Sequence, residues 1–134
     1  MKISTRSTYG LKVCQLLAEE YSKSESLALP YIAEKLSLSE AYLEQLMALL
    51  KKQNIVCSIR GAGGGYYLSN APENITIGQV IRALEGDFEF VDCISNNCDS
   101  DKHCKTKGIW KKLYDGINDI LDGITLKEMI DEEI

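Results

Sequence analysis

The spacing of apolar side chains along the first fifty residues predicts three helices. Either Ser4 or Thr5 can cap the first helix, and Pro30 suits the first turn of the second. Ser39 caps the third helix, after a tight turn at 37–39. The three predicted apolar faces are Cys14, Leu17, Ala18 and Tyr21; Ile32, Ala33 and Leu36; and Leu43, Leu46, Met47 and Leu50.

The second and third helices form a helix-turn-helix pattern, because a short helix, a three-residue turn and a longer helix follow one another. Directly behind it, 54–60 and 66–69 indicate two strands joined by a glycine-rich turn at 61–65. A phosphate-binding loop is disfavoured, because no Lys-Ser or Lys-Thr pair and no strand-to-helix transition follows the glycines. The prediction is a mainly α fold with a small β-hairpin, a winged helix-turn-helix.

Two further helices and a short final one are predicted in the second half. A capping box at 76–79 opens a helix that Gly86 ends, and a second cap at 125–128 opens the final helix. Between them lies the longest apolar stripe of the chain, and it needs a covering surface. We therefore predict a homodimer held by this helix. The predicted dimerisation residues are Trp110, Leu113, Tyr114, Ile117 and Leu121, with Ile124 ending the stripe.

The predicted organisation has three parts within one continuous structural unit. Residues 1–86 form the DNA-binding domain, 87–107 a cysteine-bearing loop, and 108–134 the dimerisation helix with the C-terminal helix. A chain of 134 residues is about one domain. No apolar run approaches the ~20 residues that span a bilayer, and the first residues lack a secretion signal. We expect a cytoplasmic protein with no membrane partner.

The charge distribution restricts where DNA can bind. The chain carries a net charge of −5 and has a pI of about 4.9, which provides no general attraction to phosphate. Through position 70, however, eight Lys and Arg outnumber six Asp and Glu, whereas the remainder has seven against fourteen. The first half is therefore the plausible DNA surface.

Three of the five cysteines, Cys93, Cys98 and Cys104, lie in the polar stretch 91–105. Such a loop cannot be ordered by apolar burial, and clustered thiols are typical of a bound metal or cluster. An odd cysteine count in a cytosolic chain disfavours a disulfide framework, so zinc and iron-sulfur ligation remain. Cys14 and Cys57 are expected to pack as small hydrophobic side chains.

Four segments together resemble the iron-sulfur cluster regulators of bacteria, the IscR, NsrR and RirA type of the Rrf2 superfamily. They are the string 42–45, the predicted wing 59–66, the segment 77–81 and the three cysteines ahead of Trp110. The resemblance covers essentially the whole chain. It implies a homodimeric winged-helix transcription factor, and a 2Fe-2S cluster, favoured over 4Fe-4S, on the three cysteines.

The resemblance leaves the fourth ligand open. In the cluster-biogenesis branch a ligand histidine stands where this chain has Lys107, and the nitric-oxide-sensing branch uses an aspartate at the position of Thr8. A lysine amine must lose its proton to ligate, against a reference pKa of about 10.4. His103 is the only imidazole. His103 and Lys107 are therefore weaker candidates than the cysteines, and solvent or a small thiol could complete the site.

DNA recognition is expected from the third helix and the wing. A glutamate can accept a hydrogen bond from cytosine N4 and a glutamine can pair with adenine, so Glu44 and Gln45 can discriminate bases. Arg60 at the wing base suits a narrow minor groove of a palindromic operator in double-stranded DNA. An exposed glutamate paired with Lys51 or Lys35 is the alternative for Glu44. The full predicted set is Ser39, Tyr42, Glu44, Gln45, Lys51, Arg60, Gly61, Gly63, Gly64 and Tyr66.

Three other functions remain as alternatives to an iron-sulfur-sensing repressor. A zinc- or thiol-redox-responsive winged-helix repressor would use the same cysteines. A small iron-sulfur electron carrier would use them too, but has no need for a wing. An enzyme is disfavoured, because a neighbour such as His103 seldom activates a thiol at Cys104 and no second catalytic group is placed beside them.

Overall fold

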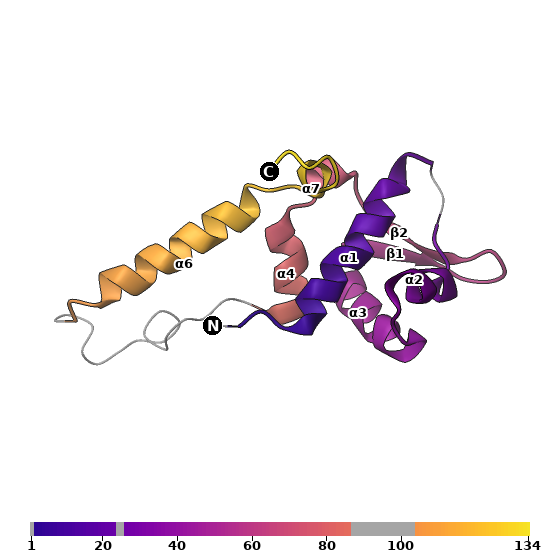
Figure 1. The fold of residues 1–134 in the computed structure, drawn as a ribbon, viewed down its shortest axis with the longest axis horizontal. Coiled ribbons are helices and arrows are strands. Elements are labelled where there is room, and N and C mark those ends of the chain that lie inside the picture. Colours follow the sequence, from indigo (N-terminus) through magenta and orange to yellow (C-terminus); the bar gives the residue numbers. More distant parts are fainter. Residues whose placement is uncertain (1, 24–25, 87–103) are drawn as a thin grey trace.

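The computed structural model describes residues 2–23, 26–86 and 104–134 (Figure 1). Its elements, in chain order, are α1 (Thr5–Glu19), the 3-10 helix η1 (Tyr21–Lys23), α2 (Leu29–Leu36), α3 (Glu40–Lys52), β1 (Val56–Ile59), β2 (Gly65–Leu68), the 3-10 helix η2 (Pro72–Asn74), α4 (Ile77–Glu85), α6 (Lys107–Asp122) and α7 (Leu126–Ile130). This mainly helical chain with one two-stranded hairpin confirms the predicted fold class.

The first helix is shorter than its apolar pattern predicts. α1 ends at Glu19, and Tyr21 lies in η1 with 39% of its surface exposed. The expectation that Tyr21 continues the buried stripe is therefore wrong. Ser4 occupies the N-cap position, but its hydroxyl bonds to the carboxylate of Glu85 instead of to the helix backbone. The helix and this distant carboxylate are thus joined at the start of the chain.

A single hydrophobic core joins α1, α2, α3 and α4. Every residue of the predicted α3 stripe is buried, as are Ile32 and Ala33 of α2, because both helices turn one apolar face into this shared core. Cys14 is fully buried in this core, and burial raises the pKa of its thiol to about 12. The prediction that Cys14 packs as a hydrophobic side chain is confirmed.

The wing is an antiparallel hairpin that is tied to the segment before α2. β1 pairs with β2, with Val56 opposite Leu68 and Ile59 opposite Gly65. Leu27 adds an isolated bridge to Tyr66, with N–O distances of 2.9 and 2.8 Å. Gly65 belongs to this strand rather than to the turn, and a Cβ there would clash with the Leu27 carbonyl. The hairpin therefore approaches the backbone ahead of α2 as closely as only glycine allows.

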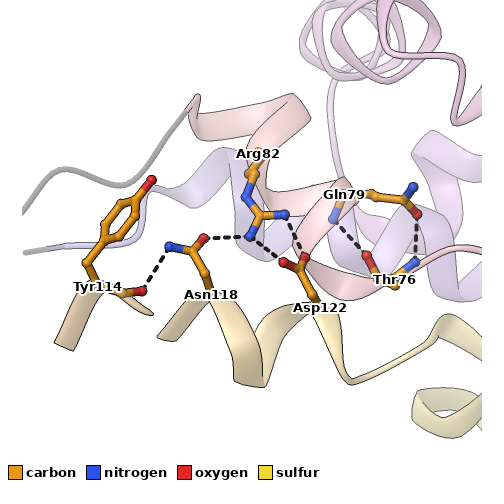
Figure 2. A network of polar contacts seen from close by, with 6 residues as sticks. All are labelled: Thr76, Gln79, Arg82, Tyr114, Asn118 and Asp122. Atoms are coloured by element: carbon orange, nitrogen blue, oxygen red, sulfur yellow. Dashed lines mark hydrogen bonds and ion pairs between the residues drawn. The ribbon is translucent and has the colours of Figure 1, made fainter. Parts of the chain in front are cut away.

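The predicted capping box of α4 is present in full. The backbone N–H of Gln79 donates to the Thr76 hydroxyl at 3.1 Å, and the backbone N–H of Thr76 donates to the Gln79 side chain at 2.8 Å (Figure 2). Gly86 ends the helix with a positive φ of 85°. The boundaries of α4 therefore follow from local sequence alone.

Replacing Thr76 with alanine should lower the free energy of unfolding by about 1 kcal/mol, because one orphan N–H at the start of α4 loses its acceptor. Urea denaturation followed by circular dichroism would measure this change. Thr8, an exposed residue within α1, provides the matched control: Thr8→Ala should change stability by less than about 0.5 kcal/mol. Equal losses in both variants would contradict the cap.

The last two helices are attached to the core in different ways. α6 extends away from the other helices in Figure 1 and has no fully buried residue. α7 returns to the body, where Leu126 is completely buried and Thr125 caps the helix. The backbone N–H of Ile77 donates to the Ile124 carbonyl at 2.8 Å, and that of Leu126 to the Ile75 carbonyl at 2.9 Å. These bonds fix the chain immediately after α6.

Candidate nucleic-acid interface

The start of α2, the outer face of α3 and the base of the wing enclose one open groove of about 420 Å³. Glu44 reaches the groove from α3, and Arg60 and Tyr66 reach it from the hairpin. Residues 28–30 lie at the N-terminus of α2, where helix N–H groups favour an anion, although Pro30 itself has no N–H. Four of the ten residues expected to bind DNA, including Gly64, therefore converge on one surface.

The outer face of α3 is polar and open. Glu44 and Gln45 are exposed, while Leu43 and Leu46 beside them are buried. Ser39 uses its hydroxyl to accept a hydrogen bond from the Tyr42 backbone N–H at 3.1 Å, which caps the helix. The side chains of α3 that are expected to read bases therefore project from a capped helix.

Tyr42 is oriented differently from its neighbours on α3. Its ring packs edge-on against Tyr9 of α1 at a centroid distance of 6.3 Å, and its hydroxyl is buried without a hydrogen-bond partner in the described part of the chain. Lys12 lies 5.3 Å above the Tyr9 ring. The aromatic part of Tyr42 thus joins α3 to α1, which leaves its expected role at DNA a prediction.

A hydrogen bond links the end of α3 to the wing. The Lys51 ammonium donates to the Ser58 hydroxyl at 2.7 Å, and Ser58 lines the groove. This contact engages the Lys51 ammonium at the wing, whereas the alternative interpretation paired it with Glu44. The described salt bridges include none formed by Glu44.

Glycines shape the tip of the wing. Gly61 and Gly63 adopt positive φ values of 96° and 79°, with open space where a side chain would stand. A Cβ on Gly64 would clash with the Ile59 carbonyl oxygen. The tip therefore requires glycine for its backbone conformation at two positions and for close packing at the third.

Only one of the three clustered cysteines falls within the described residues. Cys104 lies just before α6, is half-exposed, and has its sulfur 3.2 Å from the Thr106 hydroxyl. Cys93, Cys98 and His103 lie outside the described residues. Lys107 is the first residue of α6. Residues 2–23, 26–86 and 104–134 contain no group of three potential metal ligands, so this structure leaves the predicted ligand set untested.

Glu85 links two helices beside the cysteine loop, and the sequence pattern did not identify it. At the end of α4 its carboxylate accepts hydrogen bonds from the Ser4 N–H at 2.9 Å and the Ser7 hydroxyl at 2.8 Å. Partial burial by itself raises the pKa of Glu85, but the bonds from Ser4 and Ser7 and the charge of Arg6 outweigh it and lower that pKa. Glu85 therefore holds the start of α1 against the helix that leads into the cysteine loop.

The stability contributed by Glu85 should depend on pH. Because its folded pKa lies below the ordinary value of 4.5, the ionised carboxylate stabilises the fold above that value, and the contribution is lost as pH falls through the folded pKa. Glu85→Gln should therefore be less stable than wild type at pH 7, with the difference shrinking toward pH 3 in urea titrations. Glu73→Gln, at an exposed position in η2, is the control. A Glu85→Gln variant that matches wild type at every pH would contradict this role.

The expected dimerisation stripe is divided between two surfaces. Tyr114 and Leu121 pack, partly buried, against the core of their own chain. Leu113 remains 45% exposed. Sequence periodicity missed two apolar residues beside it, Ile109 and Ile120, which are 58% and 63% exposed. The apolar face that remains open on α6 thus runs through 109, 113 and 120.

No helix in the three described segments is both long enough and apolar enough to cross a bilayer.

Comparison with known proteins places this geometry in a family. The Rrf2 family, described as iron-dependent transcriptional regulator, matches residues 3–132. The regulator CymR of Bacillus subtilis is 38% identical over 96% of this chain and 89% of its own length.

Two solved structures share the architecture. T. potens IscR has a TM-score of 0.78 and 38% identity, covering all of this chain and 89% of that one. CymR, titled the global cysteine regulator of B. subtilis, has a TM-score of 0.79 and 36% identity over 98% of both chains. The chain therefore belongs to the Rrf2 family of transcriptional regulators.

Proposed function

We propose that this regulator acts as a homodimeric repressor that binds a palindromic operator and responds to an iron-sulfur cluster on its cysteine loop. The observation that carries the DNA-binding part is the groove in which Glu44, Arg60 and the first turn of α2 converge. It combines a base-reading acceptor, a cation and backbone N–H groups within one surface. Phosphate positioning and base recognition need these different groups.

In this proposal α3 enters the major groove and the wing the minor groove. Glu44 accepts from cytosine N4, and Gln45 pairs with adenine N6 and N7. Arg60 inserts where the minor groove is narrow, and the glycine tip allows the wing backbone to approach the phosphates. The chain is acidic overall, so its net charge does not attract DNA. Attraction therefore depends on the contacts that the DNA-reading surface itself makes with the duplex.

The cluster would be held by Cys93, Cys98 and Cys104. Cys104 fits such a role, because its thiol is half-exposed, whereas Cys14 is fully buried and has a pKa of about 12. A bound iron-sulfur cluster would supply a group that can be oxidised. Its ligation by three cysteines would also order the segment between α4 and α6. Loop ordering then biases the dimer toward one operator-binding state.

Anaerobic absorption spectra, with iron, sulfide and zinc counted on the same sample, test this proposal. Wild type should show charge-transfer bands that Cys98→Ala abolishes. Cys57→Ala is the control, since Cys57 is half-buried on β1, opposite Tyr67 of β2 and away from the cysteine loop in sequence. Selection of operators from random DNA should then give a palindrome whose affinity differs between cluster-bound and cluster-free protein. Identical footprints for the two forms would exclude cluster sensing.

A second candidate is a thiol- or zinc-responsive repressor without an iron-sulfur cluster. The 38% identity to CymR supports it, since that relative is titled a cysteine regulator. This candidate predicts a colourless protein after anaerobic reconstitution. Palindromic DNA binding would persist and would change with zinc or with thiol oxidation instead.

A further inference from the structure

α6 meets the body of its own chain at its middle and at its C-terminal end. Beyond Asp122 the backbone bonds of 124 and 126 to the body fix the chain. Tyr114 and Leu121 touch the core, but no residue of α6 is fully buried. In Figure 1 the start of α6 lies far from α1, α2 and α3. The helix therefore resembles a lever that is held toward its C-terminal end, and its N-terminal end begins shortly after Cys104.

A polar cluster links α4 to the C-terminal half of α6 (Figure 2). The Arg82 guanidinium of α4 donates to both carboxylate oxygens of Asp122, at 2.6 and 3.0 Å, and to the Asn118 side-chain oxygen at 2.5 Å. Asn118 in turn donates to the Tyr114 carbonyl at 2.8 Å. Because the guanidinium is a rigid planar fork, contacts one helical turn apart restrict both tilt and rotation of α6.

Gly78 makes this contact possible. A Cβ at this position would clash with the Asp122 carboxylate and would lie 2.9 Å from the Arg82 guanidinium. Because Arg82 and Asp122 side chains are 26% and 50% exposed, their ion pair is expected to add little to folding stability. The cluster is thus better suited to orienting α6 than to stabilising the fold.

We propose that Arg82, Asn118 and Asp122 fix the angle between the DNA-reading domain and α6, and so determine which half-site spacing the dimer accepts. This inference rests on the proposed function, since it requires a dimer that reads two half-sites. α6 spans 16 residues, or about 24 Å at ~1.5 Å per residue. A change in tilt of about 10° moves its far end by about 4 Å, close to the ~3.4 Å rise of one base pair.

The decisive comparison is Asp122→Asn against Asp115→Asn. Both carboxylates lie on α6, are about half-exposed and form an ion pair, but Asp115 pairs with Lys111 of the same helix at 2.9 Å. Operator palindromes that differ by single base pairs in half-site spacing would be titrated by fluorescence anisotropy. Wild type and Asp115→Asn should prefer one spacing by about tenfold or more. Asp122→Asn should reduce that preference at least threefold.

Gly78→Ala gives a second test without a charge change. It should displace Asp122 and broaden the spacing preference. Because alanine has a higher helix propensity than glycine, weakening of α4 itself would not explain this result. A DNA-independent readout uses Trp110, the only tryptophan, as donor to an acceptor amino acid placed at exposed Ala41 of α3. Time-resolved energy transfer should give a wider distance distribution for Asp122→Asn and Gly78→Ala than for wild type.

The two readouts separate the possible failures. Unchanged distance distributions in both variants would overturn the inference even if DNA binding were normal. Wider distributions with an unchanged spacing preference would overturn it as well, because α6 would then be oriented without consequence for the operator. If every protein, including wild type, bound all spacings equally, the proposed reading of two half-sites would fail while the distances still tested the orientation of α6.

Discussion

Replacing Leu126 with alanine should lower the free energy of unfolding by about 2–5 kcal/mol, the cost of removing a buried leucine and leaving a cavity. Leu126 has no exposed surface, and its backbone N–H bonds to the Ile75 carbonyl. It lies on the five-residue helix α7, which packs on α1 and η2. The loss should therefore destabilise the DNA-reading domain as well, since Leu126 is bonded to Ile75 of that domain. Urea unfolding followed by circular dichroism would measure it.

Ile134→Ala is the matched control for this change. Ile134 is an aliphatic residue near Leu126 in sequence, but 78% of its surface is exposed, so its loss should cost less than about 0.5 kcal/mol. If Leu126→Ala unfolded with wild-type stability, α7 would not belong to the core of the winged-helix domain. The predicted division of the chain at 86 and 108 would then describe two independent parts.

The outcome along α3 and α4 shows what sequence periodicity can predict. Each of these helices packs one apolar stripe on a single core, and capping side chains at Ser39 and Thr76 mark where each begins. Local propensity and burial therefore agree, and both helices were predicted correctly. α6 differs, because Tyr114 and Leu121 face the chain's own core while Ile109 and Ile120 stay open. A single stripe could not represent a helix with two apolar surfaces.

The candidate site was predictable to a similar extent. The helix-turn-helix and wing pattern placed Glu44 and Arg60 near one another, because adjacent elements of known type leave few arrangements. The bond between Ser4 and Glu85 and the ion pair between Arg82 and Asp122 join residues 81 and 40 positions apart. Polar pairs at such separations have no periodic signal in a single sequence, so only the folded chain identifies them.

Replacing Arg60 with alanine should weaken operator binding by about ten- to a hundredfold, the cost expected for one arginine inserted in DNA per subunit. Arg60 is exposed at the end of β1 and lines the groove with Glu44 and Tyr66. Its loss should also make the slope of log affinity against log salt concentration shallower, by about one for each phosphate contact that is lost. Fluorescence anisotropy titrations at several salt concentrations would measure both effects.

Lys127→Ala removes the same charge from a different surface, where Lys127 pairs with Asp131 on α7 at 3.0 Å. This variant should bind operator DNA nearly as wild type does, because α7 contributes no residue to the groove. Arg60→Lys separates shape recognition from charge: lysine keeps the cation but hydrates more strongly, so it should recover the salt dependence better than the affinity. If Arg60→Ala binds as tightly as wild type across all salt concentrations, the wing does not enter the DNA, and recognition would rest on α3 alone.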